Sequence, residues 1–457
     1  MNLEAIYLRL PVSLQNAAVS LEGWRIARRR YGSGYRTAEH AVQAQGDLDA
    51  VALRQFRERR LRDFLGVATQ SPYWQEQFAE YGVVPQAHDP FKELGKLPVL
   101  TKDTVKQNVA RIINPTIDRS TLLWRHTSGT TGSGLVFPET HETEWFTWTH
   151  WWRYRRWHGL TPTTWCGYFG GRSVVPVRNT RPPFWRVNRP ARQLMLSGYH
   201  LSRETAPAYL AALREFQVEW VHGYPSMLTL LAQYAKELGL PIDLPRLRVV
   251  TTGAENLSAW QREAVRSAFG VKVVQHYGQA EAAANISECE QGRLHVDEDF
   301  SAVEFVDNPH DAQSRRILGT NWLNPAFPLL RYEIGDLAVP DSTACSCGRP
   351  GRIVSSIDGR QEDYLTLPSG VRIGRLDHIF KDMVNVREAQ FVQSDRHRVT
   401  LRIARGAGYT DHDEELLLGE MQQRIGTELQ VDVEYVDAIP RGPSGKLRLV
   451  LSTVPKN

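Results

Sequence analysis

The chain has 457 residues, of which 42% are hydrophobic and 23% are charged, and its formal net charge is +4. This composition supports a substantial core in two to four domains, at about 150 residues each. The nearly balanced charge argues against a nucleic-acid-binding protein. Four cysteines are too few for a disulfide scaffold, so a location in the reducing cytoplasm is expected. No run of about 18 apolar residues occurs, and the acidic start is unlike a signal peptide.

The N-terminal part of the chain is expected to be helical. Residues 6–31 mix apolar positions with a basic run that ends at Arg30, and Pro11 interrupts the pattern. This favours a helix packed on its own domain, with peripheral membrane association as the alternative. Helical spacing recurs over residues 48–82 and 140–158, and Thr101 has the side chain of a helix N-cap.

A strand–helix alternation follows and predicts a mostly parallel sheet. Strands are expected at residues 165–169, 220–223, 247–252 and 271–277, and helices at 204–216, 225–238 and 258–269. Ligands bind at the carboxyl ends of strands in such sheets. Polar turns fall there, at residues 251–255 and 276–281, and His222 and Tyr224 lie at the end of another expected strand.

The pattern changes after about residue 300. Short strands are expected at residues 302–306, 315–320 and 338–339, and a polar joint at 357–363. The last residues predict a small α+β domain, with strands at 398–403 and 431–435 and a helix at 414–425. The expected fold is α/β, with a large domain of mixed and parallel sheets, flanking helices and a β subdomain at 1–359. A small mobile α+β domain is expected at 360–457.

A Gly-rich stretch at residues 127–134 carries the strongest functional signal. Its hydroxyl groups and backbone N–H groups suit a polyanion such as a triphosphate, and glycine lets the backbone approach a ligand closely. No Lys-Ser or Lys-Thr follows the last glycine, so it is no Walker A loop, and the glycines do not form a Rossmann fingerprint. A flexible surface loop is the alternative.

Five further polar motifs follow in order. They are Gly253-Ala254-Glu255, Tyr277-Gly278-Gln279-Ala280-Glu281, residues 331–336, residues 359–363 and residues 440–448. With the Gly-rich stretch they resemble the adenylate-forming superfamily, in its phenylacetate-CoA ligase branch with the capsule-associated, CapK-like relatives. The resemblance covers about residues 90–450.

The resemblance implies an AMP-forming ligase that uses ATP and Mg²⁺. Phosphate contacts would come from Thr127, Ser128, Gly129, Thr130, Thr131 and Gly132. Gly253, Ala254, Glu255 and Tyr277 would hold the adenine, and Gly278 and Gln279 would belong to the same ATP/AMP site, with Gln279 at a phosphate-contacting position. His222 and Tyr224 would contact the acyl group. Glu281 would bind Mg²⁺, Asp336 would accept the ribose hydroxyls, Arg360 would lie near the ribose or phosphate, and Lys446 would reach the α-phosphate. The catalytic residues would be Lys446, Glu281 and Thr127.

Two positions depart from the family pattern. Gln279 stands where Thr is usual, which puts its phosphate contact in doubt. Glu362 stands at the hinge, usually Asp or Lys, where it can still absorb a backbone rotation. In this superfamily the small domain rotates at the hinge between the two half-reactions.

A second site is suggested by cysteine and histidine. Cys289, His295, Cys345 and Cys347 have the donor types of a closed structural zinc site, and some members of this branch carry such a zinc. Unrelated buried thiols are the alternative, and Cys166, in an apolar run, is expected in the core.

The acyl group is less well defined by the sequence. Arginines crowd the region at residues 170–199, at positions 172, 178, 181, 186, 189 and 192. They suit an anionic sugar or the CoA phosphates, or are solvated loop residues. We therefore expect a small carboxylate substrate tied to polysaccharide or secondary metabolism. Three hypotheses follow for the function. The acyl group passes to CoA in the first and to an amine or hydroxyl in the second, and the third is a non-catalytic assembly protein. A homodimer is left open.

Overall fold

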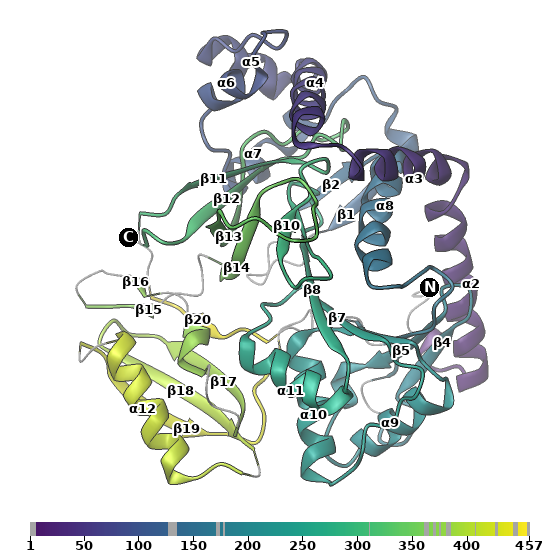
Figure 1. Cartoon of the computed structure of the whole chain (residues 1–457), viewed down its shortest axis with the longest axis vertical. Helices are drawn as coiled ribbons and strands as arrows, with labels where there is room; N and C mark the ends of the chain where they lie inside the picture. Colours follow the sequence, from purple (N-terminus) through teal and green to yellow (C-terminus); the bar gives the residue numbers. More distant parts are fainter. Residues whose placement is uncertain are drawn as a thin grey trace. The chain divides into compact units, whose positions relative to one another are not determined.

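The computed structural model describes residues 6–126, 135–170, 174–176, 179–309, 311–360, 365–368, 372–373, 376–380, 385–406, 408–425, 428–441 and 447–454. The chain forms two compact units, whose elements are labelled in Figure 1. The first unit comprises Met1–Trp24, Thr163–Gln275 and Asp358–Asn457, and the second comprises Arg25–Pro162 and His276–Ile357. Helix α2 (Val12–Arg30) begins in the first unit and ends in the second.

The first unit contains a largely parallel sheet with the order β8-β7-β6-β3-β5-β4. Its strands are β3 (Cys166–Gly170), β4 (Trp185–Asn188), β5 (Gln193–Ser197), β6 (Trp220–Gly223), β7 (Val249–Gly253) and β8 (Lys272–Gly278). The pairs β3/β5, β3/β6 and β6/β7 are parallel, and β4 pairs antiparallel with β5 at the edge. The connecting elements are η2 (Gly198–His200), α9 (Ala206–Glu215), α10 (Pro225–Glu237) and α11 (Ala259–Phe269).

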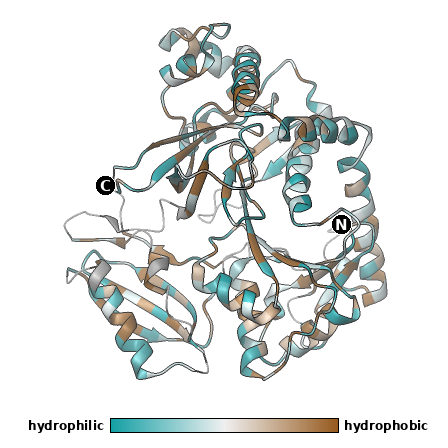
Figure 2. Ribbon diagram, in the orientation of Figure 1, coloured by the Kyte–Doolittle hydropathy of each residue, from teal (hydrophilic) through white to brown (hydrophobic). Residues whose placement is uncertain are grey.

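Local sequence explains how these helices begin and pack. Ser258 and Gln261 form a capping box that satisfies N–H groups at the start of α11, and Gly270 ends it in the left-handed region with φ +69°. Helix α10 buries most of its length because its apolar residues pack against the sheet core around Val221 and Val250. Figure 2 shows brown, hydrophobic residues concentrated along the strands.

The C-terminal part of the first unit has a separate sheet with the order β19-β18-β17-β20. Its elements are β15 (Leu365–Thr366), β16 (Arg372–Ile373), η3 (Leu376–Phe380), β17 (Val386–Gln393), β18 (Arg398–Arg405), α12 (Asp411–Ile425), β19 (Gln430–Tyr435) and β20 (Val450–Ser452). Helix α12 lies along this sheet in Figure 1, and its Leu417 and Met421 pack with Phe391 and Leu401.

The second unit is built on the sheet order β11-β12-β13-β14-β10-β9-β8, with antiparallel pairs β8/β9, β9/β10, β10/β14, β11/β12 and β12/β13. Its strands are β9 (Asn285–Glu288), β10 (Leu294–Val296), β11 (Ala302–Asp307), β12 (Arg315–Thr320), β13 (Tyr332–Asp341) and β14 (Ile353–Arg360). Its helices are α3 (Ser33–Gly46), α4 (Ala50–Ala68), α5 (Pro72–Tyr81), α6 (Pro90–Lys96), α7 (Lys102–Ile112), η1 (Arg119–Thr121) and α8 (His141–Trp157). Strands β1 (Leu123–His126) and β2 (Val136–Glu139) pair antiparallel.

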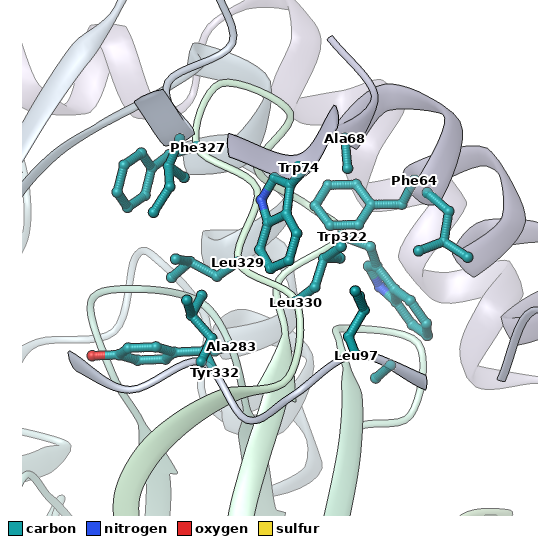
Figure 3. Close-up of a cluster of buried hydrophobic side chains, with 14 of the residues drawn as sticks. Phe64, Ala68, Trp74, Leu97, Ala283, Trp322, Phe327, Leu329, Leu330 and Tyr332 are labelled. Atoms are coloured by element: carbon teal, nitrogen blue, oxygen red, sulfur yellow. The ribbon is translucent and has the colours of Figure 1, made fainter. Parts of the chain in front are cut away.

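The core of the second unit joins its helices to Tyr332, the first residue of β13. Figure 3 shows Trp74 and Phe64 beside Trp322, with Tyr332 and Ala283 in the same cluster. The indole of Trp74 donates to the carbonyl of Pro328 at 2.8 Å, so this large buried ring has its one polar atom satisfied.

The α/β fold class is confirmed, and most expected elements occur within a few residues of the predicted bounds. The polar joint at 357–363 is wrong in its first half, because residues 357–360 continue β14. Cys166 is buried, as expected. The division at 359/360 stays a prediction. Among the described residues, no helix combines the length and apolar character of a bilayer span.

Candidate active site

In the first unit, polar aromatic side chains gather where β3 and β6 end. His222 Nδ1 lies 2.8 Å from the hydroxyl of Thr251 in β7, and the His222 ring stacks on Tyr168 with centroids 5.5 Å apart. Tyr224 follows as the N-cap residue of α10, and burial raises the pKa of its hydroxyl to about 12. The two predicted acyl-contacting residues thus lie two positions apart at a strand end, among aromatic side chains.

The turn after β7 holds Ala254 and Glu255. Ala254 adopts φ +67°, a left-handed conformation that costs a non-glycine residue energy. The Glu255 carboxylate accepts two backbone N–H groups, from Ser226 at 3.1 Å and from Leu447 at 2.9 Å. Burial raises the pKa of Glu255, while the Leu447 and Ser226 hydrogen bonds act in the opposite direction.

In the second unit, the predicted adenine and ribose residues meet. The hydroxyl of Tyr277, in β8, donates to Asp336 Oδ2, in β13, at 2.6 Å. The Gln279 side chain accepts from the backbone N–H of Ala284 at 3.3 Å and so braces its own turn. Gly278 has little room for a side chain, since an added Cβ would lie 3.0 Å from Asn285 Oδ1.

Glu281, the predicted magnesium ligand, lies on the same turn and is only 7% exposed. The hydroxyl of Tyr332 lies 3.2 Å from Glu281 Oε1, and Asn321 donates to its backbone carbonyl at 3.1 Å. Burial raises the pKa of Glu281, and the charge of Asp336 adds to this, whereas Lys102 lowers it. A buried carboxyl group with a raised pKa and a second carboxylate nearby suits a divalent cation, which would favour the charged form.

The cysteine and histidine residues come together in the second unit. The ligand atoms of Cys289, His295, Cys345 and Cys347 all lie within 4.8 Å of one another. Cys289 Sγ and Cys345 Sγ are 3.7 Å apart, and Cys347 Sγ and His295 Nε2 are 3.4 Å apart. Bond lengths of about 2.3 Å for zinc–sulfur give tetrahedral edges of roughly 3.8 Å, so the spacing fits that ion.

A charged cluster at the base of the β1–β2 hairpin was not foreseen. Arg125 donates to Glu139 through Nε at 2.7 Å and to Glu144 at 2.9 Å. Arg29 makes two hydrogen bonds of 2.9 Å to the same Glu144. In the sequence, Arg125 just before the Gly-rich stretch and Glu139 just after it could have indicated this cluster. The Gly-rich stretch joins β1 to β2.

Several predicted residues lie outside the described part of the chain. They are Thr127, Ser128, Gly129, Thr130, Thr131, Gly132, Glu362 and Lys446, together with the side chain of Arg360. Among the arginines near residues 170–199, Arg186 is buried and donates to Gln15 at 2.6 Å and to the carbonyl of Pro183 at 3.0 Å. The buried Arg186 side chain therefore makes its hydrogen bonds within the fold.

Two family models match the chain. The AMP-binding enzyme family matches residues 191–321, and the CapK C-terminal domain family matches residues 365–453. Protein CapK of Staphylococcus aureus is 25% identical over 460 residues, covering 99% of this chain and 100% of that protein. Phenylacetate-coenzyme A ligase of Thermus thermophilus is 26% identical over 273 residues, covering 52% of this chain and 61% of that protein.

A solved structure shares the fold. The crystal structure of a 2-hydroxyisobutyryl-CoA ligase in the postadenylation state superposes with a TM-score of 0.68, at 17% identity over 90% of this chain and 91% of that one. Fold and matches together define the class as an AMP-forming ligase, similar to the acid:CoA ligases. Within the adenylate-forming superfamily, the chain is similar to the branch of phenylacetate-CoA ligase and CapK. Enzymes of this class use ATP, generally with Mg²⁺, to form an acyl-adenylate and pass the acyl group to coenzyme A.

Proposed function

We propose that this protein activates a small carboxylate with ATP and transfers the acyl group to coenzyme A. A carboxylate oxygen attacks the α-phosphorus of ATP and pyrophosphate leaves; the thiolate of CoA then attacks the acyl carbon and AMP leaves. The observation that carries the proposal is the hydrogen bond between Tyr277 in β8 and Asp336 in β13, next to the turn after β8 that holds buried Glu281.

The described residues have chemistry suited to these steps. The phenol ring of Tyr277 offers a flat face for adenine, and its hydrogen bond fixes the ring. An ionised Asp336 can accept several hydrogen bonds, including those of a ribose. Glu281 would bind Mg²⁺, which neutralises phosphate charge. Lys446 lies outside the described residues, and the family resemblance assigns it the supply of a cation at the α-phosphate as charge develops.

Pyrophosphate exchange across a panel of carboxylates tests the adenylation step. We expect exchange with at least one acid and its loss, by at least about a hundredfold, in Lys446→Ala, because a charge aimed at the transition state is removed. Lys236→Ala, exposed on α10, is the matched control and should exchange like the wild type. An unchanged rate in Lys446→Ala would refute the role of that lysine.

The panel and the acceptor also separate narrower proposals. We infer a carboxylate from polysaccharide or secondary metabolism, supported by similarity to CapK over nearly the whole chain. Exchange only with phenylacetate and benzoates would contradict it. AMP release with CoA alone, compared with release when amine or hydroxyl acceptors are added, decides between thioester formation and a CoA-independent ligase.

We further propose that Cys289, His295, Cys345 and Cys347 hold one structural zinc ion. His295 lies in β10 and Cys289 directly follows β9, and both side chains are buried. The spacing of the four ligand atoms suits tetrahedral coordination. Such a site would tie residues 345–347 to that hairpin and stabilise the fold.

Metal analysis of the purified protein tests the zinc proposal. We expect about one zinc per chain, and loss of zinc with a lower melting temperature in Cys345→Ser/Cys347→Ser. The control Cys166→Ser alters a buried thiol of the first unit and should keep its zinc. A wild-type protein that contains no zinc and takes none up would rule the site out.

A further inference from the structure

The segment that follows the predicted catalytic lysine is attached to β17 of its own small sheet. Gln390 Nε2 donates to the carbonyl of Arg448 at 3.0 Å, and the N–H of Phe391 donates to the carbonyl of Leu449 at 2.7 Å. Strand β20 then continues beside β17, with Phe391 opposite Val450. These contacts move with the C-terminal sheet in any arrangement that the sheet adopts.

The segment that precedes Lys446 is attached to the same strand. The carboxylate of Glu388 accepts the N–H of Ile439 at 3.0 Å and pairs with Arg441. The described stretches of chain on both sides of Lys446 in the sequence are therefore anchored on β17. Neither of these anchors involves the parallel sheet of the first unit.

One hydrogen bond differs from the rest, because it comes from the turn after β7. Glu255 Oε1 accepts the N–H of Leu447, the residue directly after Lys446, at 2.9 Å. Its other oxygen accepts the N–H of Ser226, at the start of α10, at 3.1 Å. Both oxygens thus bind backbone donors, one in the parallel-sheet region and one in the C-terminal segment.

We propose that Glu255 is a positioning residue that fastens the Lys446 segment for adenylation and must release it before acyl transfer. The proposal rests on the proposed function. A carboxylate is suited to this task, because each of its oxygens accepts one N–H, and hydrogen bonds to a charged acceptor are the stronger kind. A backbone N–H as the partner makes the contact independent of the side chain at 447.

The rotation expected for this family separates the two kinds of contact. If the C-terminal sheet turns between the half-reactions, the bonds of Glu388, Gln390 and Phe391 persist, whereas the Glu255–Leu447 bond cannot. The bond therefore favours one of the two arrangements. A weaker bond should slow the step that needs Lys446 near the α-phosphate, and it should not slow acyl transfer, which follows release of the bond.

Glu255→Gln tests this with almost no change of shape. A glutamine has one acceptor oxygen, and that oxygen is uncharged. The bond to Leu447 is therefore either lost, where the amide NH₂ faces it, or reduced to the weaker bond of a neutral acceptor. We expect pyrophosphate exchange to fall about tenfold or more through kcat, with little change in the KM for ATP. Acyl transfer from a preformed acyl-adenylate, made from the best acid of the panel, should change less than about twofold.

Amide hydrogen exchange gives a readout that needs no substrate. In Glu255→Gln, peptides that contain Leu447 should exchange faster, while those from β18 should not change. The matched control is Glu388→Gln, whose lost bond lies wholly within the C-terminal part of the chain, so it should slow both half-reactions alike.

Three results would overturn the proposal. In the first, Glu255→Gln slows both half-reactions equally. In the second, it leaves hydrogen exchange at Leu447 unchanged. In the third, it raises the KM for ATP and leaves kcat and hydrogen exchange unchanged. The last would assign Glu255 to the adenine instead. If the wild type exchanges pyrophosphate with no acid, the proposed function fails, while the Leu447 hydrogen exchange still reports on the contact.

Discussion

At the scale of single residues, the second unit is organised by a buried arginine. Arg153 of α8 donates to Asp299 at 2.6 and 2.9 Å and to Asp297 at 2.9 Å, and His150 Nε2 lies 3.3 Å from Asp299. Asp297 also accepts bonds of 2.6 Å from Asn285 and Ser287 on β9. Burial alone would raise the pKa of Asp299, but the charge of Arg153 outweighs it and holds that pKa well below its usual range. These bonds join α8 to β9, the strand that pairs with β8 and its Tyr277.

Removing one charge from this cluster should be costly. In Asp299→Asn the buried guanidinium of Arg153 loses part of its compensation, and we expect the free energy of unfolding to fall by about 3–5 kcal/mol. Urea denaturation measures this. Asp307→Asn is the control, since its side chain is 97% exposed and its ion pair with Arg315 should contribute less than about 1 kcal/mol. A loss below about 1 kcal/mol in Asp299→Asn would show that the cluster does not stabilise the fold.

At the scale of elements, the sequence predicted most where hydrophobic periodicity was regular. Helices α8, α10 and α11 and strands β6 and β7 lie within two residues of the expected bounds, because burial of one face imposes a clear period. Strand β13 was recognised only at residues 338–339, since Asp336 interrupts the apolar face that Tyr332, Ile334 and Ala338 share. The end of β14 was misread as a joint for the same reason. Residues chosen for ligands disturb the pattern on which prediction depends.

The same limit applies to the candidate site. The motif order singled out Tyr277, Glu281 and Asp336, and the structure brings these three together in the second unit. The order of the motifs could not indicate that Gln279 braces its own turn. Nor could it indicate that Glu255 binds the N–H of Leu447, 192 residues away in sequence. Backbone N–H groups are the same at every non-proline residue, so such contacts leave no trace in composition or spacing.

At the scale of the whole molecule, the stability of the protein should depend on pH through a histidine next to Tyr277. The ring of His276 lies against Trp151 and Tyr154, with centroids 5.7 and 5.2 Å apart. Its Nε2 is buried and makes no hydrogen bond within the described part of the chain. Burial, aided by the charge of Arg155, lowers the pKa of His276 to about 3, so the folded protein keeps this ring neutral.

The direction of the pH effect follows from this lowered pKa. Below about pH 6.5 an unfolded chain binds a proton at His276 and the folded chain does not, so the stabilising contribution is complete above pH 6.5 and is lost as the pH falls toward 3. The free energy of unfolding should drop by about 1.4 kcal/mol for each pH unit in this window through His276 alone. Urea midpoints between pH 7 and 5 measure the slope, which should be shallower by that amount in His276→Phe. His412→Gln, exposed on α12, should keep the wild-type slope. Equal slopes in the wild type and His276→Phe would mean that the folded protein protonates His276 as readily as the unfolded chain, and that the ring is solvated rather than packed against Trp151 and Tyr154.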